Sequence, residues 1–233
     1  MNWATHMLQL HLTNFIVIAE DEKVYQFLTN TTDLKGHVLR SSEFHRPFEA
    51  HGAHAFVEYD SKGFSWCSRP HYLLSVVRYG YTAIWIDSDA VLLRSPMHIL
   101  PDMYDIVVTE DSNQPQSYSI PCSCFIVARP RPATLDLLRS WATLCGDATQ
   151  DQHSLGAALN MLRGNVSMYM MPVQAFPNGF FMNATEVSAL PSSLQPYWVH
   201  ANWRVGKDAK NRFLIANGAW IEQRQDTFCK IAN

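Results

Sequence analysis

Two aspartates, Asp87 and Asp89, stand two positions apart directly after the apolar run Ile84–Ile86. In an extended chain, residues two positions apart project from the same side, so both carboxylates are expected to face one site. Two carboxylates this close repel each other unless a cation lies between them, and oxygen ligands with room for water and phosphate suit Mn²⁺ or Mg²⁺. Such a metal would bridge a diphosphate and stabilise the charge that develops as it leaves. The alternative is a pair of solvated turn residues after a strand.

The hydrophobic pattern predicts the elements that must position this pair. Short apolar runs bounded by polar residues predict buried strands at residues 14–19, 37–40, 82–86, 105–109 and 123–128, with another short strand around Val199. Apolar residues at helical spacing predict helices at residues 2–12, 22–28, 67–79, 133–144, 151–162 and 208–217.

Strands that alternate with helices predict an α/β fold, with a mostly parallel Rossmann-type sheet and helices on both faces. We expect a single domain over residues 1–233. In such sheets ligands gather at the carboxyl ends of the strands, which is where Asp87 and Asp89 are expected.

The composition excludes several other classes of protein. With 47% hydrophobic and 17% charged residues, the chain is folded, and its formal net charge of −3 provides no basic field for nucleic acid. Five cysteines without a CxxC pair argue against a structural zinc site, and their odd number leaves one thiol free or paired between chains. No transmembrane run and no signal peptide is visible, so a membrane anchor is expected only outside this sequence.

Seven segments, in a fixed order along the chain, resemble one enzyme family. They are Asn2-Trp3, Asn14–Ala19, Leu73–Leu93, Cys122–Pro130, Asp151-Gln152, Phe176–Gly179 and His200–Lys210. Together they resemble the nucleotide-diphospho-sugar transferases of glycosyltransferase family 77, which include plant xylosyl- and arabinosyltransferases. The resemblance implies a GT-A-like fold and a hexosyl- or pentosyltransferase that uses a nucleotide-sugar donor, in particular a UDP-sugar. It also implies a glycan or glycoprotein acceptor and retention of the anomeric configuration.

The resemblance also implies a metal site and a diphosphate site. Asp87 and Asp89 would form the DxD metal motif, with His200 as the third ligand, since a neutral imidazole suits Mn²⁺. Glycine admits a close backbone approach and lysine neutralises a leaving phosphate. The diphosphate-binding set implied in this way is Asp87, Gly206, Lys207 and Lys210. A hydrogen-bonded core histidine is the alternative for His200.

Asp151 and Gln152 are expected to start a helix beside the donor sugar. The resemblance makes them the candidate catalytic residues, because a carboxylate stabilises oxocarbenium character and an amide binds a hydroxyl. Neither is assigned as a covalent nucleophile. The alternative is that Asp151 caps the helix and favours its dipole, which leaves Gln152 unexplained.

A rival function fits the same strand. The segment Ile86–Leu92 resembles the nucleophile motif of haloacid-dehalogenase-type phosphatases, with Thr109 and Gly146–Asp151 as later motifs. That class places the Asp87 strand at the centre of the sheet with Asp147 beside it. A transferase instead requires His200 beside Asp87.

The chain also departs from the transferase family. Cys124 stands where the family pattern has a glycine, which would crowd the donor pocket, and Asn2-Trp3 open the chain where the family has an earlier strand. We therefore expect the first strand to be missing, beside residues 14–19 and near residues 82–86. A non-catalytic nucleotide- or sugar-binding remnant is the third hypothesis.

Other clusters give less specific predictions. The His-rich loop at residues 45–54 is expected to carry surface histidines rather than a metal site, and Cys122 and Cys124 are expected to pack in a strand rather than to act in redox chemistry. The aromatic turn at residues 176–181 is expected in the core, with acceptor-facing rings as the alternative. The sequons at Asn30, Asn165 and Asn183 favour a secretory route, and the resemblance extends this to a glycoprotein of the Golgi lumen.

Overall fold

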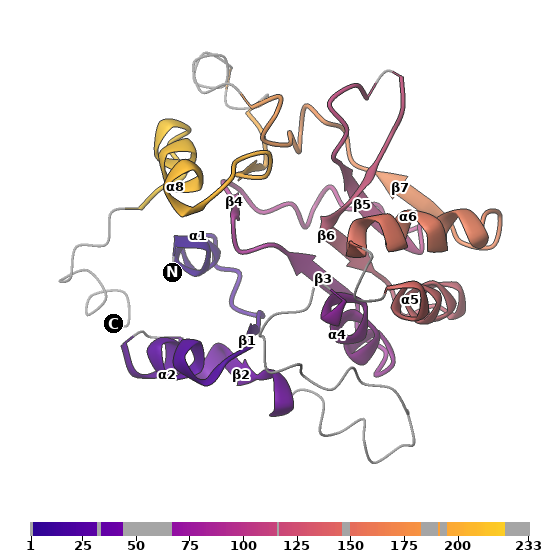
Figure 1. Cartoon of the computed structure of the whole chain (residues 1–233), viewed down its shortest axis with the longest axis horizontal. Helices are drawn as coiled ribbons and strands as arrows, with labels where there is room; N and C mark the ends of the chain where they lie inside the picture. The colour runs from indigo at the N-terminus through magenta and orange to yellow at the C-terminus, as the bar shows by residue number, and fades with distance from the viewer. Residues whose placement is uncertain are drawn as a thin grey trace.

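The computed structural model describes residues 2–31, 34–43, 67–115, 117–145, 150–182, 191 and 195–221 (Figure 1). Its elements in chain order are α1 (Asn2–Gln9), β1 (Val17–Ala19), α2 (Glu22–Thr31), the 3-10 helix η1 (Lys35–His37), β2 (Val38–Arg40), α4 (Ser68–Val77), β3 (Ala83–Ile86), β4 (Ala90–Leu92), β5 (Ile106–Glu110), β6 (Pro121–Ala128), α5 (Pro132–Leu144), α6 (Asp151–Met161), β7 (Met168–Met170), β8 (Trp198–His200) and α8 (Lys207–Ala216). Each predicted helix and strand is found, with shifts at the ends. The strands β4 and β7 are not predicted, although they are as long as β1, β2 and β8.

The central sheet has four strands in the order β3-β6-β5-β7. Strand β6 runs antiparallel to both β3 and β5, and only β5 and β7 pair in parallel. The α/β class is therefore right, but the prediction of a mostly parallel sheet is wrong. Only residues 111–120 connect β5 to β6, and this is too short for the crossover that a parallel pair requires.

Strands β3, β5 and β7 nevertheless point in one direction, so their carboxyl ends meet at one edge of the sheet. The pairing of β5 with β6 shifts between Val108 and Thr109 and leaves residues 123–125 as extra residues of β6 at this edge. Asp87, just past β3, donates its backbone N–H to the carbonyl of Cys124 at 2.9 Å. A bulge of this kind redirects side chains next to a site, and here it does so beside the two aspartates.

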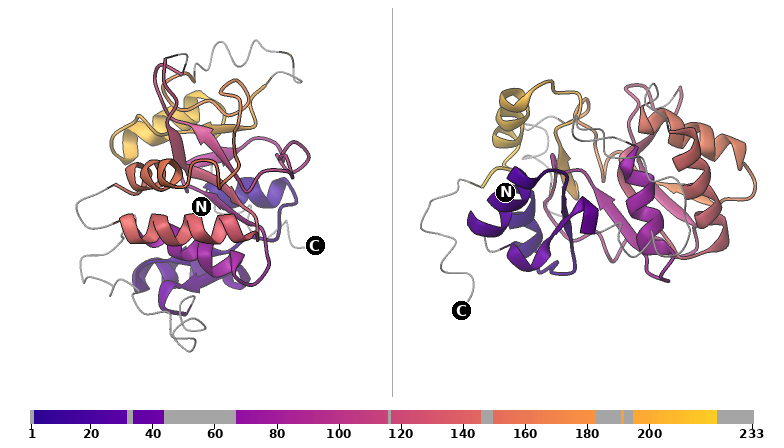
Figure 2. Two further views of the ribbon diagram at one scale, coloured as in Figure 1. Left: turned by 90° about the vertical axis from the view of Figure 1, so that its right-hand side faces the viewer. Right: turned by 60° about the horizontal axis from the view of Figure 1, so that its bottom comes forward.

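Helices cover both faces of the central sheet, as predicted (Figure 2). On one face α4, α5 and α6 bury an apolar core in which Trp141 packs near Ile126. On the other face α1 and the segments around β4 and β8 enclose an aromatic core. Its central rings are Phe125, Phe176 and Trp198.

Two short strand pairs complete the fold. Strands β1 and β2 pair in parallel, and β4 pairs antiparallel with β8 so that Ala90 lies opposite His200. All residues of β4 and β8 are buried, so apolar burial fixes the pairing that carries His200 toward the aspartates. Among the described strands β3 pairs with β6 alone. The expectation of a further strand, beside residues 14–19 and near residues 82–86, is not tested by these pairings.

Two disulfides stabilise the chain. Cys67–Cys145 joins the start of α4 to the end of α5, and Cys122–Cys124 lies within β6. The fifth cysteine, Cys229, and the His-rich loop at residues 45–54 lie outside the described residues. Within the part of the chain that the structure describes, every helix is too short or too polar to cross a membrane.

Candidate functional site

Asp87, Asp89 and His200 meet at the carboxyl edge of the central sheet. The Nε2 atom of His200 lies 3.5 Å from Oδ1 of Asp89, and one ligand atom from each of the three residues lies within 4.8 Å of the others. The predicted convergence is therefore confirmed. His200 is 2% exposed, and its Nδ1 atom has no hydrogen-bond partner among the described residues. A core histidine satisfied by its neighbours does not account for this atom.

A buried arginine that the sequence analysis did not select holds the first aspartate from the other side. Arg69 is 3% exposed and donates to Oδ1 of Asp87 at 2.9 Å, to Oγ of Ser123 at 2.5 Å and to the carboxylate of Asp151. Burial raises the pKa of Asp87, and the charges of Arg69 and His200 offset only part of this effect. Arg69 thus links the Asp-Ser-Asp turn to the start of α6.

The helical spacing of α4 contains the information that would have identified Arg69. Tyr72, Leu73 and Val77 lie three, four and eight positions after it and are buried with it, so Arg69 lies on the core-facing side of the helix. A buried cation requires a carboxylate partner. The sequence does not reveal that Asp87 and Asp151 are both partners of Arg69, because that depends on how α4 packs against β3 and α6.

Helix α8 presents a cation to the second aspartate. Nζ of Lys210 lies 2.5 Å from Oδ2 of Asp89. Burial raises the pKa of Asp89, but the hydrogen bonds and charges of His200 and Lys210 outweigh burial and hold the pKa well below its usual range. Gly206 is the N-cap residue of α8 at φ 84°, a left-handed conformation that favours glycine, and Lys207 begins the helix.

Asp151 and Gln152 begin α6, as predicted. Asp151 does not cap the helix, because the preceding residue occupies the N-cap position and the buried Asp151 carboxylate pairs with Arg69. The capping interpretation is therefore wrong. Gln152 accepts a hydrogen bond from the backbone N–H of Ser123 at 3.3 Å and donates from Nε2 to Asp111 at 3.0 Å.

Asp111, which follows β5, ties Gln152 to the segment after β8. Its Oδ1 atom accepts hydrogen bonds from Nδ2 of Asn202 at 2.5 Å and from Nε1 of Trp203 at 3.0 Å, while Oδ2 accepts the bond from Gln152. Three donors fix this carboxylate in one orientation. The sequence analysis did not select Asp111, since neither spacing nor a motif sets it apart from other polar residues after strands.

These groups line one open cleft of about 2330 Å³. Its polar lining includes Asp87, Asp89, Asp111, Asp151, Gln152, His200, Lys207 and Lys210. Pockets for one small ligand enclose roughly 300–1,000 Å³. The cleft is therefore larger than a pocket for one small ligand.

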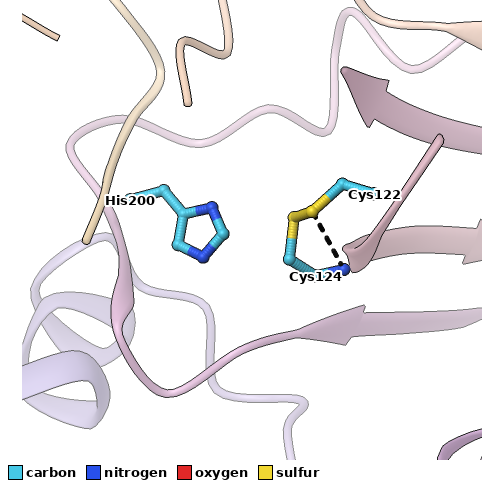
Figure 3. Close-up of side chains that lie close together, drawn as sticks. All are labelled: Cys122, Cys124 and His200. Atoms are coloured by element: carbon cyan, nitrogen blue, oxygen red, sulfur yellow. Dashed lines mark hydrogen bonds between the residues drawn. A yellow bond between two sulfur atoms is a disulfide. The ribbon is translucent and has the colours of Figure 1, made fainter. Parts of the chain in front are cut away.

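A disulfide lies beside the metal-ligand set. Figure 3 shows the bonded sulfurs of Cys122 and Cys124 facing the imidazole ring of His200, and one ligand atom of each residue lies within 4.8 Å of the others. Both cysteines are buried in β6, as predicted, but they are also joined to each other. Cysteine binds metals as a thiolate, and a disulfide has none. With Cys122 and Cys124 bonded to each other, the carboxylates of Asp87 and Asp89 are the metal-binding partners available to His200.

The site geometry favours the transferase over the phosphatase hypothesis. The phosphatase hypothesis requires Asp147 beside Asp87, whereas the described side chains that meet Asp87 include Arg69 and His200. His200 lies near Asp87, as a transferase requires. Asp147, the second acidic residue of the phosphatase interpretation, lies outside the described residues.

Comparisons with known proteins give matches of sequence and of fold. Residues 10–214 match the model of the nucleotide-diphospho-sugar transferase family. The UDP-D-xylose:L-fucose alpha-1,3-D-xylosyltransferase 3 of Arabidopsis thaliana is 26% identical over 94% of this chain and 62% of its own length. A second UDP-D-xylose:L-fucose alpha-1,3-D-xylosyltransferase of that species is 29% identical over 66% of this chain and 48% of its own length.

This chain thus spans only 62% and 48% of the lengths of these two relatives. Among solved structures, the apo structure of the bifunctional glycosyltransferase WbbM matches with a TM-score of 0.52, over 94% of this chain and 47% of that chain. The sequence identity of 12% means that this match concerns the fold alone.

Proposed function

This chain belongs to the nucleotide-diphospho-sugar transferase family, and from that premise we propose that it transfers a sugar from a nucleotide diphosphate to a glycan or glycoprotein acceptor with a divalent cation. The observation that carries the proposal is the meeting of Asp87, Asp89 and His200 in a cleft that the N-terminal turn of α8 also lines. A carboxylate pair beside a helix N-terminus and two lysines suits a metal ion with a diphosphate.

The side chains present fit Mn²⁺ or Mg²⁺. Two carboxylates and an imidazole are a donor set that Mn²⁺ accepts, and the carboxylates alone suit Mg²⁺. One observation supports a cation here: the Asp89 carboxylate already binds the ammonium group of Lys210 and lies 3.5 Å from Nε2 of His200. When bound, the metal would neutralise charge on the departing diphosphate.

The first turn of α8 would hold the diphosphate. The exposed backbone N–H groups of a helix N-terminus attract anions, and the N-cap residue of this helix, Gly206, has no side chain to cap them. Gly206 leaves open space where another residue would carry a Cβ atom. Lys207 and Lys210 add two positive charges from the same turn.

Asp151 and Gln152 would act at the donor sugar. The buried ion pair between Asp151 and Arg69 makes Asp151 an unsuitable covalent nucleophile, but its charge would stabilise the positive character that develops at the anomeric carbon. The amide of Gln152, oriented by Ser123 and Asp111, would bind a sugar hydroxyl. We propose transfer with retention of configuration.

The names of the matched relatives direct the choice of substrates. They name UDP-D-xylose as donor and L-fucose as acceptor, so we propose a UDP-pentose donor and a fucose-containing acceptor for this chain. The two disulfides and the exposed sequon residues Asn30 and Asn165 support a secretory location, which we place in the Golgi lumen. The third sequon, at Asn183, lies outside the described residues.

Calorimetric titration of UDP tests the metal site. We expect wild-type chain to bind UDP with Mn²⁺ present and at least about tenfold more weakly without it, and Asp89→Asn to lose this dependence. Asp102→Asn is the matched control, because Asp102 is 96% exposed and does not line the cleft. Equal UDP binding by wild type and Asp89→Asn in Mn²⁺ would refute the assignment. UDP release from UDP-xylose with a fucoside acceptor then tests transfer.

A further inference from the structure

We propose that Trp203 and Phe180 form a stacking platform for a pyranose ring of the acceptor glycan, an inference that rests on the proposed transferase function. Their side chains are 47% and 52% exposed, and the ring centroids lie 5.5 Å apart at an interplanar angle of 60°. Phe181, 37% exposed, packs edge-on against Phe180. Of the three phenylalanines in the aromatic turn at residues 176–181, only Phe176 lies in the core as predicted. Large exposed aromatic groups gathered beside a cleft are typical of binding surfaces.

The backbone beneath Phe180 is fixed although its ring is exposed. Asn178 is 1% exposed, and its Nδ2 atom donates to the carbonyl of Ser112 at 2.9 Å. Its Oδ1 atom accepts the backbone N–H groups of Phe180 at 3.0 Å and Phe181 at 3.3 Å. A rigid turn loses little conformational freedom when its exposed rings bind a ligand.

Asn202 joins this turn to Trp203. The backbone N–H of Gly179 donates to Oδ1 of Asn202 at 2.5 Å, and a Cβ atom at Gly179 would overlap the Asn202 carbonyl and lie 2.9 Å from the carbonyl oxygen of His200. The two exposed rings are therefore carried by two segments in direct backbone contact. Only glycine permits that contact.

Trp203 has φ 59°, a left-handed conformation that a bulky residue rarely adopts. Its Nε1 atom donates to Asp111 at 3.0 Å, and this bond helps to fix the ring at the mouth of the cleft. Backbone strain of this kind persists only where surrounding contacts determine it, and it clusters at ligand-binding sites. An exposed tryptophan held this way is not explained by core packing.

The hydrogen bonds place Trp203, the platform residue that lines the cleft, at its sugar end. Asp111 accepts from both Trp203 and Gln152, the residue proposed to bind the donor sugar. The acceptor must lie beside that sugar, whereas the diphosphate is proposed at Lys207 and Lys210. The face of an aromatic ring carries negative potential and attracts the polarised C–H groups on one face of a pyranose.

The test separates acceptor binding from donor binding in Trp203→Ala and Trp203→Phe. Methyl α-L-fucopyranoside is the probe, followed by saturation-transfer NMR, and UDP with Mn²⁺ is titrated by calorimetry. We expect Trp203→Ala to weaken fucoside binding and to raise the acceptor KM by about tenfold, while the UDP affinity changes less than about twofold. Trp203→Phe should retain most of the fucoside binding. Tyr118→Ala is the matched control, because Tyr118 is also 47% exposed but does not line the cleft.

Each outcome decides between the two proposals. Unchanged fucoside binding in Trp203→Ala, with UDP binding intact, would overturn the platform alone. A loss of UDP affinity as large as the loss of fucoside affinity would also overturn it, since the ring would then serve the nucleotide or the fold. A wild-type chain that binds the fucoside through Trp203 but binds no UDP with Mn²⁺ would support the sugar platform and overturn the transferase proposal.

Discussion

Replacing Lys210 by methionine tests how the site changes partners when a ligand enters. In the structure the ammonium group of Lys210 lies 2.5 Å from the carboxylate of Asp89. A divalent cation must compete with this ammonium group for Asp89, whereas a diphosphate would attract it. Lys210→Met keeps a side chain of similar length without the charge. We therefore predict tighter binding of Mn²⁺ alone and weaker binding of UDP in the presence of Mn²⁺.

The size of the effect follows from the separation and exposure of the two charges. Unit charges about 4 Å apart interact by about 1 kcal/mol in water and about 4 kcal/mol at an effective dielectric constant of 20. The Lys210 side chain is 38% exposed and that of Asp89 is 22% exposed, so solvent screens much of the interaction. We therefore expect removal of the Lys210 charge to change each binding free energy by about 1–2 kcal/mol, which is a change of about 5- to 30-fold in each dissociation constant.

Competition with a chelating dye measures the Mn²⁺ affinity of the nucleotide-free chain, and calorimetry measures UDP binding at saturating Mn²⁺. Lys207→Met is the control: it removes a charge from the same helical turn, so it should weaken UDP binding without tightening Mn²⁺ binding. If Lys210→Met weakened Mn²⁺ binding, or left both affinities unchanged, Lys210 would not be competing with the metal for Asp89. The role assigned to this lysine would then be wrong.

Three further predictions concern the scaffold. Gly179→Ala should lower the free energy of unfolding by about 2 kcal/mol or more in urea titrations, because its methyl group would overlap neighbouring backbone; an unchanged midpoint would contradict the close packing. Replacing Cys67 and Cys145 together by alanine should cost about 4 kcal/mol in the same assay, since the disulfide closes a loop with a sequence separation of 78; a loss below 1 kcal/mol would refute this. Burial raises the pKa of Asp105, but hydrogen bonds from Ser167 and a salt bridge outweigh burial and lower it. The stability advantage of wild type over Asp105→Asn should therefore hold from pH 7 to about pH 5 and shrink as the pH falls below about 4, whereas a pH-independent difference would show that Asp105 does not titrate as argued.

The sequence identifies elements whose residues form a local pattern. The strand before Asp87 is predicted by its apolar run, and α6 begins at the predicted Asp151. The direction of the strands is not predicted, because apolar runs are the same in parallel and antiparallel pairs and the direction depends on the connections. Strand β4 is not predicted, yet its pairing with β8 brings His200 to Asp89.

Residues that act through tertiary contacts were found only in the structure. Arg69 and Asp111 belong to no sequence motif, and each becomes significant through the partners that the fold supplies. The predicted site residues, in contrast, came from a family resemblance, which assigns roles to positions along the chain. That resemblance identified His200 as a partner of the two aspartates but did not identify Arg69, the buried cation on their other side.

The charges that the structure brings together imply that metal and nucleotide bind cooperatively. Three carboxylates, Asp87, Asp89 and Asp151, face two cations, Arg69 and Lys210, so the formal charges of these five side chains sum to −1. A divalent cation alone would leave the site with a positive excess, and a diphosphate alone would add negative charge beside the carboxylates. Each ligand should therefore improve the affinity for the other, and by linkage Mn²⁺ must tighten UDP binding by the same factor by which UDP tightens Mn²⁺ binding. Titrations in both orders measure this factor; a value near one would mean that the two ligands do not share the charges of this site, and a smaller factor is expected in Asp89→Asn because one of the shared charges is absent.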